Sequence, residues 1–314
     1  MEKEKSGADG IIKPKLLPYA VFLDLDTLLV ALTNLLDREF PPGLGSIPGV
    51  SPFLLVAAHS AKNTFNAIRY LVADSPSDPI RKPEYALAAG PMLRSLADLL
   101  FTIIFMREDF ASRVTWYHKS GWRELKERLD RYKAEYGALP EFQAWIKGYE
   151  VSLDVGGKEY GVTESEKANL KSLKYWPIPN QMLRMSDLSA DNRIFLQYVE
   201  DWIYKEPSAD SHMTSVAFIL RQVILLMKKE HGREEKLEQI KSDTISMALT
   251  LILAIVTEVN NICKFELDKK LAYFWRILIE YWREAKGLYE RRYQSMLSEK
   301  ASIPTAEPPA SEAF

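Results

Sequence analysis

EYALAAGPMLRSLADLLFTIIFM, residues Glu84–Met106, is apolar on nearly every side of the helix that its composition predicts. A helix without a polar face has to be buried by its neighbours. Arg94 and Asp98 are the only charges between Glu84 and Arg107, and a spacing of four places both on one face. The stretch therefore predicts a buried helix with one charged pair in a low-dielectric setting.

The rest of the chain is predicted to be helical as well. Glycine is scarce, at 14 of 314 residues, the 17 prolines cluster in a few places, and apolar residues between the clusters recur every three to four positions. We expect an all-α protein, a multi-helix bundle, with helices at 17–37, 51–73, 84–107, 109–118, 121–136, 140–150, 163–173, 190–204, 211–230, 234–262 and 266–297. Gly156 and Gly157 lie between short alternating segments, which favours a small β-hairpin over 152–162.

The domain organisation follows from the composition at both ends. Residues 1–15 and 299–314 are charged or rich in Pro, Ala and Glu, and both segments are expected to be disordered. Between them we expect a helical core domain over 16–232 and a long C-terminal helical hairpin over 233–298 packed on that core.

The last predicted helix carries a wide apolar stripe that needs a partner. Apolar residues alternate by four and three along it, and aromatic residues repeat by seven beside them. The partner is either the helix at 234–262 of the same chain or a second subunit. In the second case the homodimer contact would be made by Leu271, Phe274, Trp275, Leu278, Tyr281 and Trp282.

Composition and charge exclude several classes of protein. The 41 Lys and Arg residues nearly balance 43 Asp and Glu residues, so a nucleic acid would need a local patch to bind. A single cysteine excludes an intramolecular disulfide, and no phosphate-binding loop, dinucleotide fingerprint or zinc motif is present. We therefore expect no cofactor and no metal. The N-terminus shows no signal peptide and the apolar runs are short or broken, so we expect a cytoplasmic protein without a membrane segment.

A second polar cluster follows an aromatic segment further along the chain. Tyr204, Ser208 and His212 are spaced by four and four. At the N-terminus of the following helix, the helix dipole would lower the proton affinity of His212, which suits a neutral base near pH 7. A plain capping loop explains the same residues equally well. For Arg94 and Asp98 the alternatives are a structural ion pair or a polar pocket that positions an anion or a histidine.

The order of these features resembles an uncharacterised, mostly bacterial family of helical domains of unknown function. In that family an apolar helix carries Arg-Ser-Leu-x-Glu, and a Tyr-x3-Ser-x3-His segment follows. The stretch 94–98 of this chain matches the first motif with Asp98 in place of Glu, and Tyr204, Ser208 and His212 match the second. The resemblance implies an α-helical fold with these five residues in one polar cluster. It also implies a link to defence or stress, which some members of the family have, and an analogy of fold with HEPN ribonucleases.

HEPN ribonucleases also use an Arg and a His about five residues apart, and Arg113 and His118 have that spacing. The residue after Arg113 is apolar, against the usual polar choice. We therefore interpret this segment as an ordinary amphipathic helix.

Two functions are argued from the sequence, and a small-molecule pocket between helices, which no residue identifies, is a third alternative. In the first, the cluster binds or cleaves a phosphate-bearing ligand, RNA in the first instance, with Arg94 holding the anion, Asp98 orienting Arg94 or His212, and His212 as general base. Tyr204 and Ser208 would then donate hydrogen bonds to the ligand. In the second, the protein is a non-catalytic helical interaction module and the cluster only stabilises the fold. The sequence leaves open whether the protein is an enzyme.

Overall fold

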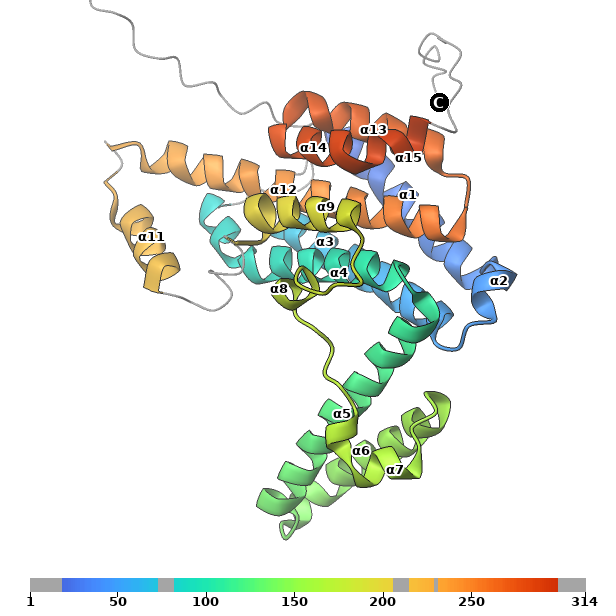
Figure 1. The fold of residues 1–314 in the computed structure, drawn as a ribbon. Helices are drawn as coiled ribbons and strands as arrows, with labels where there is room; N and C mark the ends of the chain where they lie inside the picture. Colours follow the sequence, from blue (N-terminus) through green and yellow to red (C-terminus); the bar gives the residue numbers. More distant parts are fainter. Residues whose placement is uncertain (1–18, 73–81, 206–214, 229–230, 299–314) are drawn as a thin grey trace, which may run out of the picture.

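The computed structural model describes residues 19–72, 82–205, 215–228 and 231–298. All regular secondary structure in these residues is helical, which confirms the all-α prediction (Figure 1). The segments predicted to be disordered, 1–15 and 299–314, lie outside the described residues.

The helices divide into a body and a projecting arm. The first part of the body contains α1 (Tyr19–Arg38), α2 (Pro42–Gly45), α3 (Val50–Val72), η1 (Pro83–Ala88) and α4 (Gly90–Arg107). The arm contains α5 (Phe110–Tyr136), α6 (Pro140–Glu159), α7 (Glu164–Ala168) and η2 (Leu170–Ser172). The body continues with α8 (Pro179–Met182), α9 (Ala190–Val199), η3 (Glu200–Tyr204), α11 (Ser215–Leu226), α12 (Arg233–Cys263), α13 (Asp268–Tyr281), α14 (Arg283–Leu288), η5 (Tyr289–Tyr293) and α15 (Gln294–Ser298).

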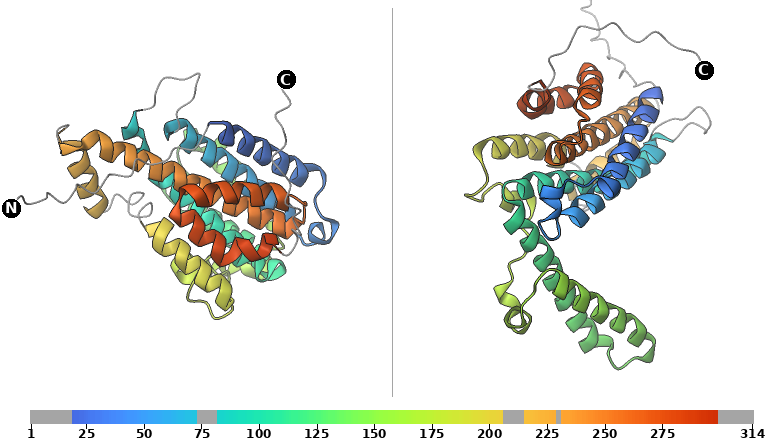
Figure 2. Two further views of the ribbon diagram at one scale, coloured as in Figure 1. Left: turned by 90° about the horizontal axis from the view of Figure 1, so that it is seen from above. Right: turned by 90° about the vertical axis from the view of Figure 1, so that its right-hand side faces the viewer.

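Helix α12 runs through the middle of the body. It packs against α3, α4 and η1, and α13 and α14 also contact it (Figures 1 and 2). Every residue from Ala248 to Asn260 is buried, because this part of the helix is apolar nearly all round. Helix α12 thus lies at the centre of the packed body, and the predicted division of the chain at residue 232 stays a prediction.

The length and composition of α12 would also suit a membrane-spanning helix. However, 83% of its most apolar window is buried inside the protein. This burial is typical of a core helix, and the other helices of the described residues do not meet the length and composition that spanning requires.

The last predicted helix, 266–297, is not continuous. The backbone of Trp282 is extended, with φ −135° and ψ 128°, so α13 ends at Tyr281 and α14 begins at Arg283. The stripe on α13 packs against α12 of the same chain, where the Trp275 indole Nε1 donates a hydrogen bond of 3.0 Å to Thr257 Oγ1.

The residues predicted for a homodimer contact are largely taken up by this packing. Leu271, Phe274, Trp275 and Leu278 are buried within the chain, and Tyr281 and Trp282 are partly buried. The first of the two alternatives, a partner helix in the same chain, accounts for the stripe. A dimer through it stays a prediction.

The arm is a helical hairpin with a small core of its own (Figure 2). The β-hairpin predicted over 152–162 is wrong, because α6 continues to Glu159. Gly157 serves close packing there: a Cβ at this position would lie 3.1 Å from Nε1 of Trp122. That Nε1 donates a hydrogen bond of 2.8 Å to the carbonyl oxygen of Leu153. The helices at 109–118 and 121–136 are likewise one helix, α5.

We expect Ile252→Ala in α12 to lower the free energy of unfolding by about 2–5 kcal/mol, because it opens a cavity in a fully buried site. Ile194→Ala makes the same chemical change at a side chain that is 58% exposed in α9, and should cost less than about 1 kcal/mol. Urea unfolding of both variants measures the difference, and equal losses would contradict the central place of α12.

Candidate functional site

Three of the five predicted site residues come together in the structure. Arg94 and Asp98 lie on α4, where the Nε of Arg94 is 3.5 Å from Oδ2 of Asp98. Tyr204 comes from η3, and its ring centre lies 5.7 Å from the central guanidinium carbon of Arg94. The other two predicted residues, Ser208 and His212, lie outside the described residues.

A widened helical turn positions Tyr204. Helix α9 continues at Glu200 into one turn of π-helix, η3, which ends at Tyr204. Such turns inside α-helices frequently accompany functional sites, because the extra residue changes the direction of the side chains. The Tyr204 ring packs against Phe101 of α4, with ring centres 5.8 Å apart, so α4 supplies both the charged pair and the apolar support of the tyrosine.

The charged pair is more open than the sequence predicts. The side chain of Arg94 is 24% exposed and that of Asp98 is 41% exposed. The pair lies in the N-terminal half of α4, whereas the residues that follow, from Leu100 to Met106, make the deeply buried half of the helix. Solvent therefore reaches the two charges, and the low-dielectric setting inferred from the whole stretch applies only to its second half.

Tyr204, in contrast to the charged pair, is buried. Burial raises the pKa of the Tyr204 hydroxyl, and the nearby Asp98 charge raises it further. The hydroxyl is therefore protonated at neutral pH and acts as a neutral hydrogen-bond donor. An arginine, a carboxylate and a phenol thus face one another at the edge of the body.

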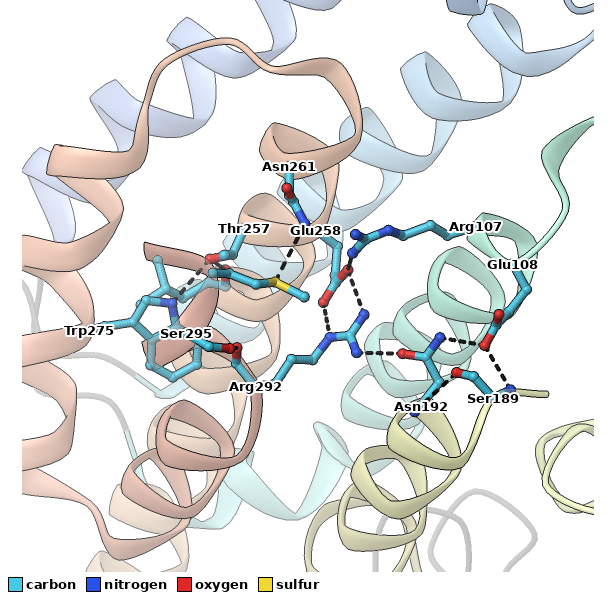
Figure 3. Close-up of polar contacts among 12 residues, drawn as sticks. Arg107, Glu108, Ser189, Asn192, Thr257, Glu258, Asn261, Trp275, Arg292 and Ser295 are labelled. Atoms are coloured by element: carbon cyan, nitrogen blue, oxygen red, sulfur yellow. Dashed lines mark hydrogen bonds and ion pairs between the residues drawn. The ribbon is translucent and has the colours of Figure 1, made fainter. Parts of the chain in front are cut away.

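A different polar cluster, around Glu258, lies deeper in the body and was not predicted from the sequence (Figure 3). Its centre is Glu258 of α12, whose side chain is fully buried. Arg292, on the π-helical turn η5, donates hydrogen bonds to both oxygens of Glu258, and its Nη2 lies 3.1 Å from Oε2. Arg107, at the end of α4, approaches Oε2 of the same carboxylate at 3.2 Å. One buried carboxylate therefore joins α4, α12 and η5.

The cluster continues to α9 (Figure 3). Arg292 also donates to the amide oxygen of Asn192, whose Nδ2 lies 2.6 Å from Oε1 of Glu108. The backbone N–H of Ser189 donates to the same Glu108 oxygen at 2.9 Å. These contacts join α9 to α4 and η5, and they fix the helices relative to one another.

The signal for this cluster is present in the sequence. Glu258 is the only charge in the apolar run 247–262, just as Arg94 and Asp98 are the only charges between Glu84 and Arg107. A lone charge in an apolar helix needs an opposite charge from elsewhere. The sequence does not show that Arg292, 34 residues later, supplies it.

The Arg113 and His118 pair is engaged with different partners. Arg113 is buried and donates to the Phe105 carbonyl oxygen and to the Asp187 carboxylate, at 2.6 Å for the latter. The His118 Nε2 instead lies 3.2 Å from the Gly49 carbonyl oxygen. These contacts agree with the interpretation of the segment as structural.

Within the described residues, no group of three or more His, Cys, Asp or Glu side chains is arranged to hold a metal ion. No protein-family model, curated protein or solved structure matches the chain. The resemblance to a family of helical domains therefore stays a prediction.

We expect Glu258→Gln to lower the free energy of unfolding by about 3–5 kcal/mol, because the substitution leaves the buried Arg292 without its counter-charge. The matched control is Asp154→Asn, which breaks an exposed ion pair with Lys158 and should change stability by less than about 1 kcal/mol. Chemical unfolding compares the two, and a loss below 1 kcal/mol for Glu258→Gln would show that the carboxylate does not hold the helices together.

Glu108 should make stability depend on pH. Burial alone would raise its pKa, but hydrogen bonds from Ser189 and Asn192 outweigh burial and hold the pKa below the ordinary value of 4.5. A carboxyl group with a lowered folded-state pKa stabilises the fold above its unfolded pKa and loses that contribution as the pH falls through the folded value. The melting temperature of the wild type should therefore exceed that of Glu108→Gln at pH 7, and the gap should shrink below pH 4.5. A gap that stays constant with pH would contradict this role.

Proposed function

We propose that this protein binds a phosphate-bearing ligand, RNA in the first instance, at the cluster of Arg94, Asp98 and Tyr204. The observation that supports the proposal is the convergence of these residues from α4 and η3, with the arginine still partly open to solvent. Arginine is the side chain best suited to hold a phosphate, because its planar group presents several N–H donors in fixed directions.

Each member of the cluster has a part in this proposal. Asp98 engages the Nε side of the Arg94 guanidinium, which would orient its terminal nitrogens toward a ligand. Tyr204 would donate a hydrogen bond from its hydroxyl to a phosphate oxygen, because its raised pKa keeps the hydroxyl protonated. Arg94 supplies a positive charge and Tyr204 a neutral donor for an anion, while the negative charge of Asp98 is paired with Arg94.

Cleavage of the bound RNA would need a base, and we propose His212 for it. The sequence carries Ser208 and His212 four and eight residues after Tyr204, so both belong to the chain segment that leaves the cluster. In this proposal His212 accepts the proton of the attacking ribose 2′-hydroxyl as its oxygen bonds to phosphorus, the bond from phosphorus to the 5′-oxygen breaks, and the leaving oxygen takes a proton from water. Arg94 stabilises the charge that develops on the phosphate, and Ser208 donates a further hydrogen bond.

The non-catalytic interaction module is the second candidate, and helix α11 favours it. Four apolar side chains of this short helix are at least 44% exposed, namely Ile219, Val223, Leu225 and Leu226. Exposed apolar groups gathered on one element often mark a contact with another protein. In this candidate the Arg94 cluster only joins α4 to η3.

We expect purified protein to bind fluorescein-labelled single-stranded RNA, and Arg94→Gln to weaken binding about tenfold. Loss of one arginine–phosphate contact should also make the slope of log affinity against log salt concentration shallower by about one. A purely structural role of Arg94 would leave that slope unchanged. Fluorescence anisotropy at several salt concentrations measures both quantities. Arg276→Gln, an exposed arginine on α13, is the matched control and should bind as the wild type does.

Gel analysis of the same RNA tests cleavage. His212→Ala should abolish cutting and leave binding within about threefold, while melting within a few degrees of the wild type. Tyr204→Phe, which removes only the hydroxyl, should weaken binding modestly. If the wild type neither binds nor cuts RNA, and Arg94→Gln changes only the melting temperature, the proposal fails and the interaction module replaces it.

A further inference from the structure

The base of the arm contains a cleft of about 680 Å³ between α5 and α6, a volume typical of small-molecule sites. Aromatic rings form much of its wall. The rings that line it are Tyr117, His118, Trp122, Tyr160 and Trp176. They contact one another: His118 stacks on Tyr160 at 4.1 Å with the planes 6° apart, and Tyr117 meets Trp176 edge-on at 5.1 Å.

The charge of the cleft is negative. Glu124 and Glu159 are among its lining residues, and no lysine or arginine is. In the part of the chain that the structure describes, neither carboxylate forms an ion pair. Basic side chains on the same helices are held by other acids: Lys119 lies 2.8 Å from Glu166.

Lys158 and Arg123, which also lie near the cleft, are paired with carboxylates other than Glu124 and Glu159. Lys158 lies 2.7 Å from Asp154, and Arg123 lies 2.8 Å from Glu127. Burial lowers the pKa of His118, although the Gly49 carbonyl and Glu159 oppose the shift, so the imidazole is largely neutral at pH 7. The cleft thus keeps two uncompensated negative charges beside aromatic walls.

We propose that this cleft binds a small organic cation with a flat aromatic body, such as an arylalkylammonium ion. Aromatic faces attract a positive charge through the negative potential of the ring, and they also stack on a flat ligand. Glu124 and Glu159 would pair with the ammonium group. An anion or a phosphate would meet two like charges here.

This site shares no residue with the Arg94 cluster. Its lining comes from α5, α6 and the segment around Trp176, whereas the cluster comes from α4 and η3. The two proposals therefore stand or fall separately.

Calorimetric titration of the full chain tests the site with three probes of one shape: tyramine, which is cationic, tyrosol, in which a hydroxyl replaces the ammonium, and the anion 3-(4-hydroxyphenyl)propionate. We expect tyramine to bind at least tenfold more tightly than tyrosol, which corresponds to about 1.4 kcal/mol. The anion should bind more weakly than tyrosol. No binding of tyramine at 10 mM, or equal binding of tyramine and tyrosol, would overturn the proposal.

Two variants assign the preference to the cleft. The double substitution Glu124→Gln and Glu159→Gln should remove the preference for tyramine over tyrosol without lowering the melting temperature, because both side chains are exposed. The control pair, Glu135→Gln and Glu141→Gln, changes the charge of the same helices by the same amount at the far end of the arm and should leave the preference intact. A preference that survives in the first double variant would place tyramine elsewhere and refute the site.

Discussion

The burial of α12 is the constraint on which the rest of the structure depends. This helix has no polar face over its central turns, so other helices have to enclose it. Helices α3 and α4 and the turn η1 pack on it, and the C-terminal helices α13 and α14 cover it further. Because two segments far apart in the sequence share one central helix, neither of them can bury its own apolar surface alone.

Polar groups then fix how the enclosing helices are oriented. Apolar packing is not directional, so it tolerates sliding between helices. A buried charge does not, because its partners have to stand at hydrogen-bond distance. Glu258 fixes α4 through Arg107 and η5 through Arg292 in this way. Arg292 in turn fixes α9 through its hydrogen bond to Asn192. Both described π-helical turns contain a residue of a polar cluster, Tyr204 in η3 and Arg292 in η5, and the extra residue of each turn sets the direction of those side chains.

The sequence predicts the helical class and most helices, because apolar spacing reports which face of each segment is buried. It fails where long-range packing decides. Gly157 resembles a turn residue in the sequence, but it is in a helix because Trp122 packs against it. Trp282 continues the heptad of the last helix in the sequence, yet its backbone is extended, and the stripe is divided between two helices. For the site, the spacing of four between Arg94 and Asp98 predicts their contact, whereas the place of Tyr204 beside them depends on long-range packing that local spacing does not encode. Local spacing carries no information about the partner of Glu258.

The late position of α12 in the chain has a consequence for biosynthesis. Helices α3 and α4 leave the ribosome long before the helix that covers them, and the ion pair of Arg107 with Glu258 joins residues 151 positions apart. Contacts of such long range form slowly, and domains generally fold as units during synthesis. The nascent chain must therefore carry the exposed apolar faces of α3 and α4 until residue 263 has emerged. During that interval a chaperone that holds apolar segments would do for the nascent chain what α12 does for the finished protein.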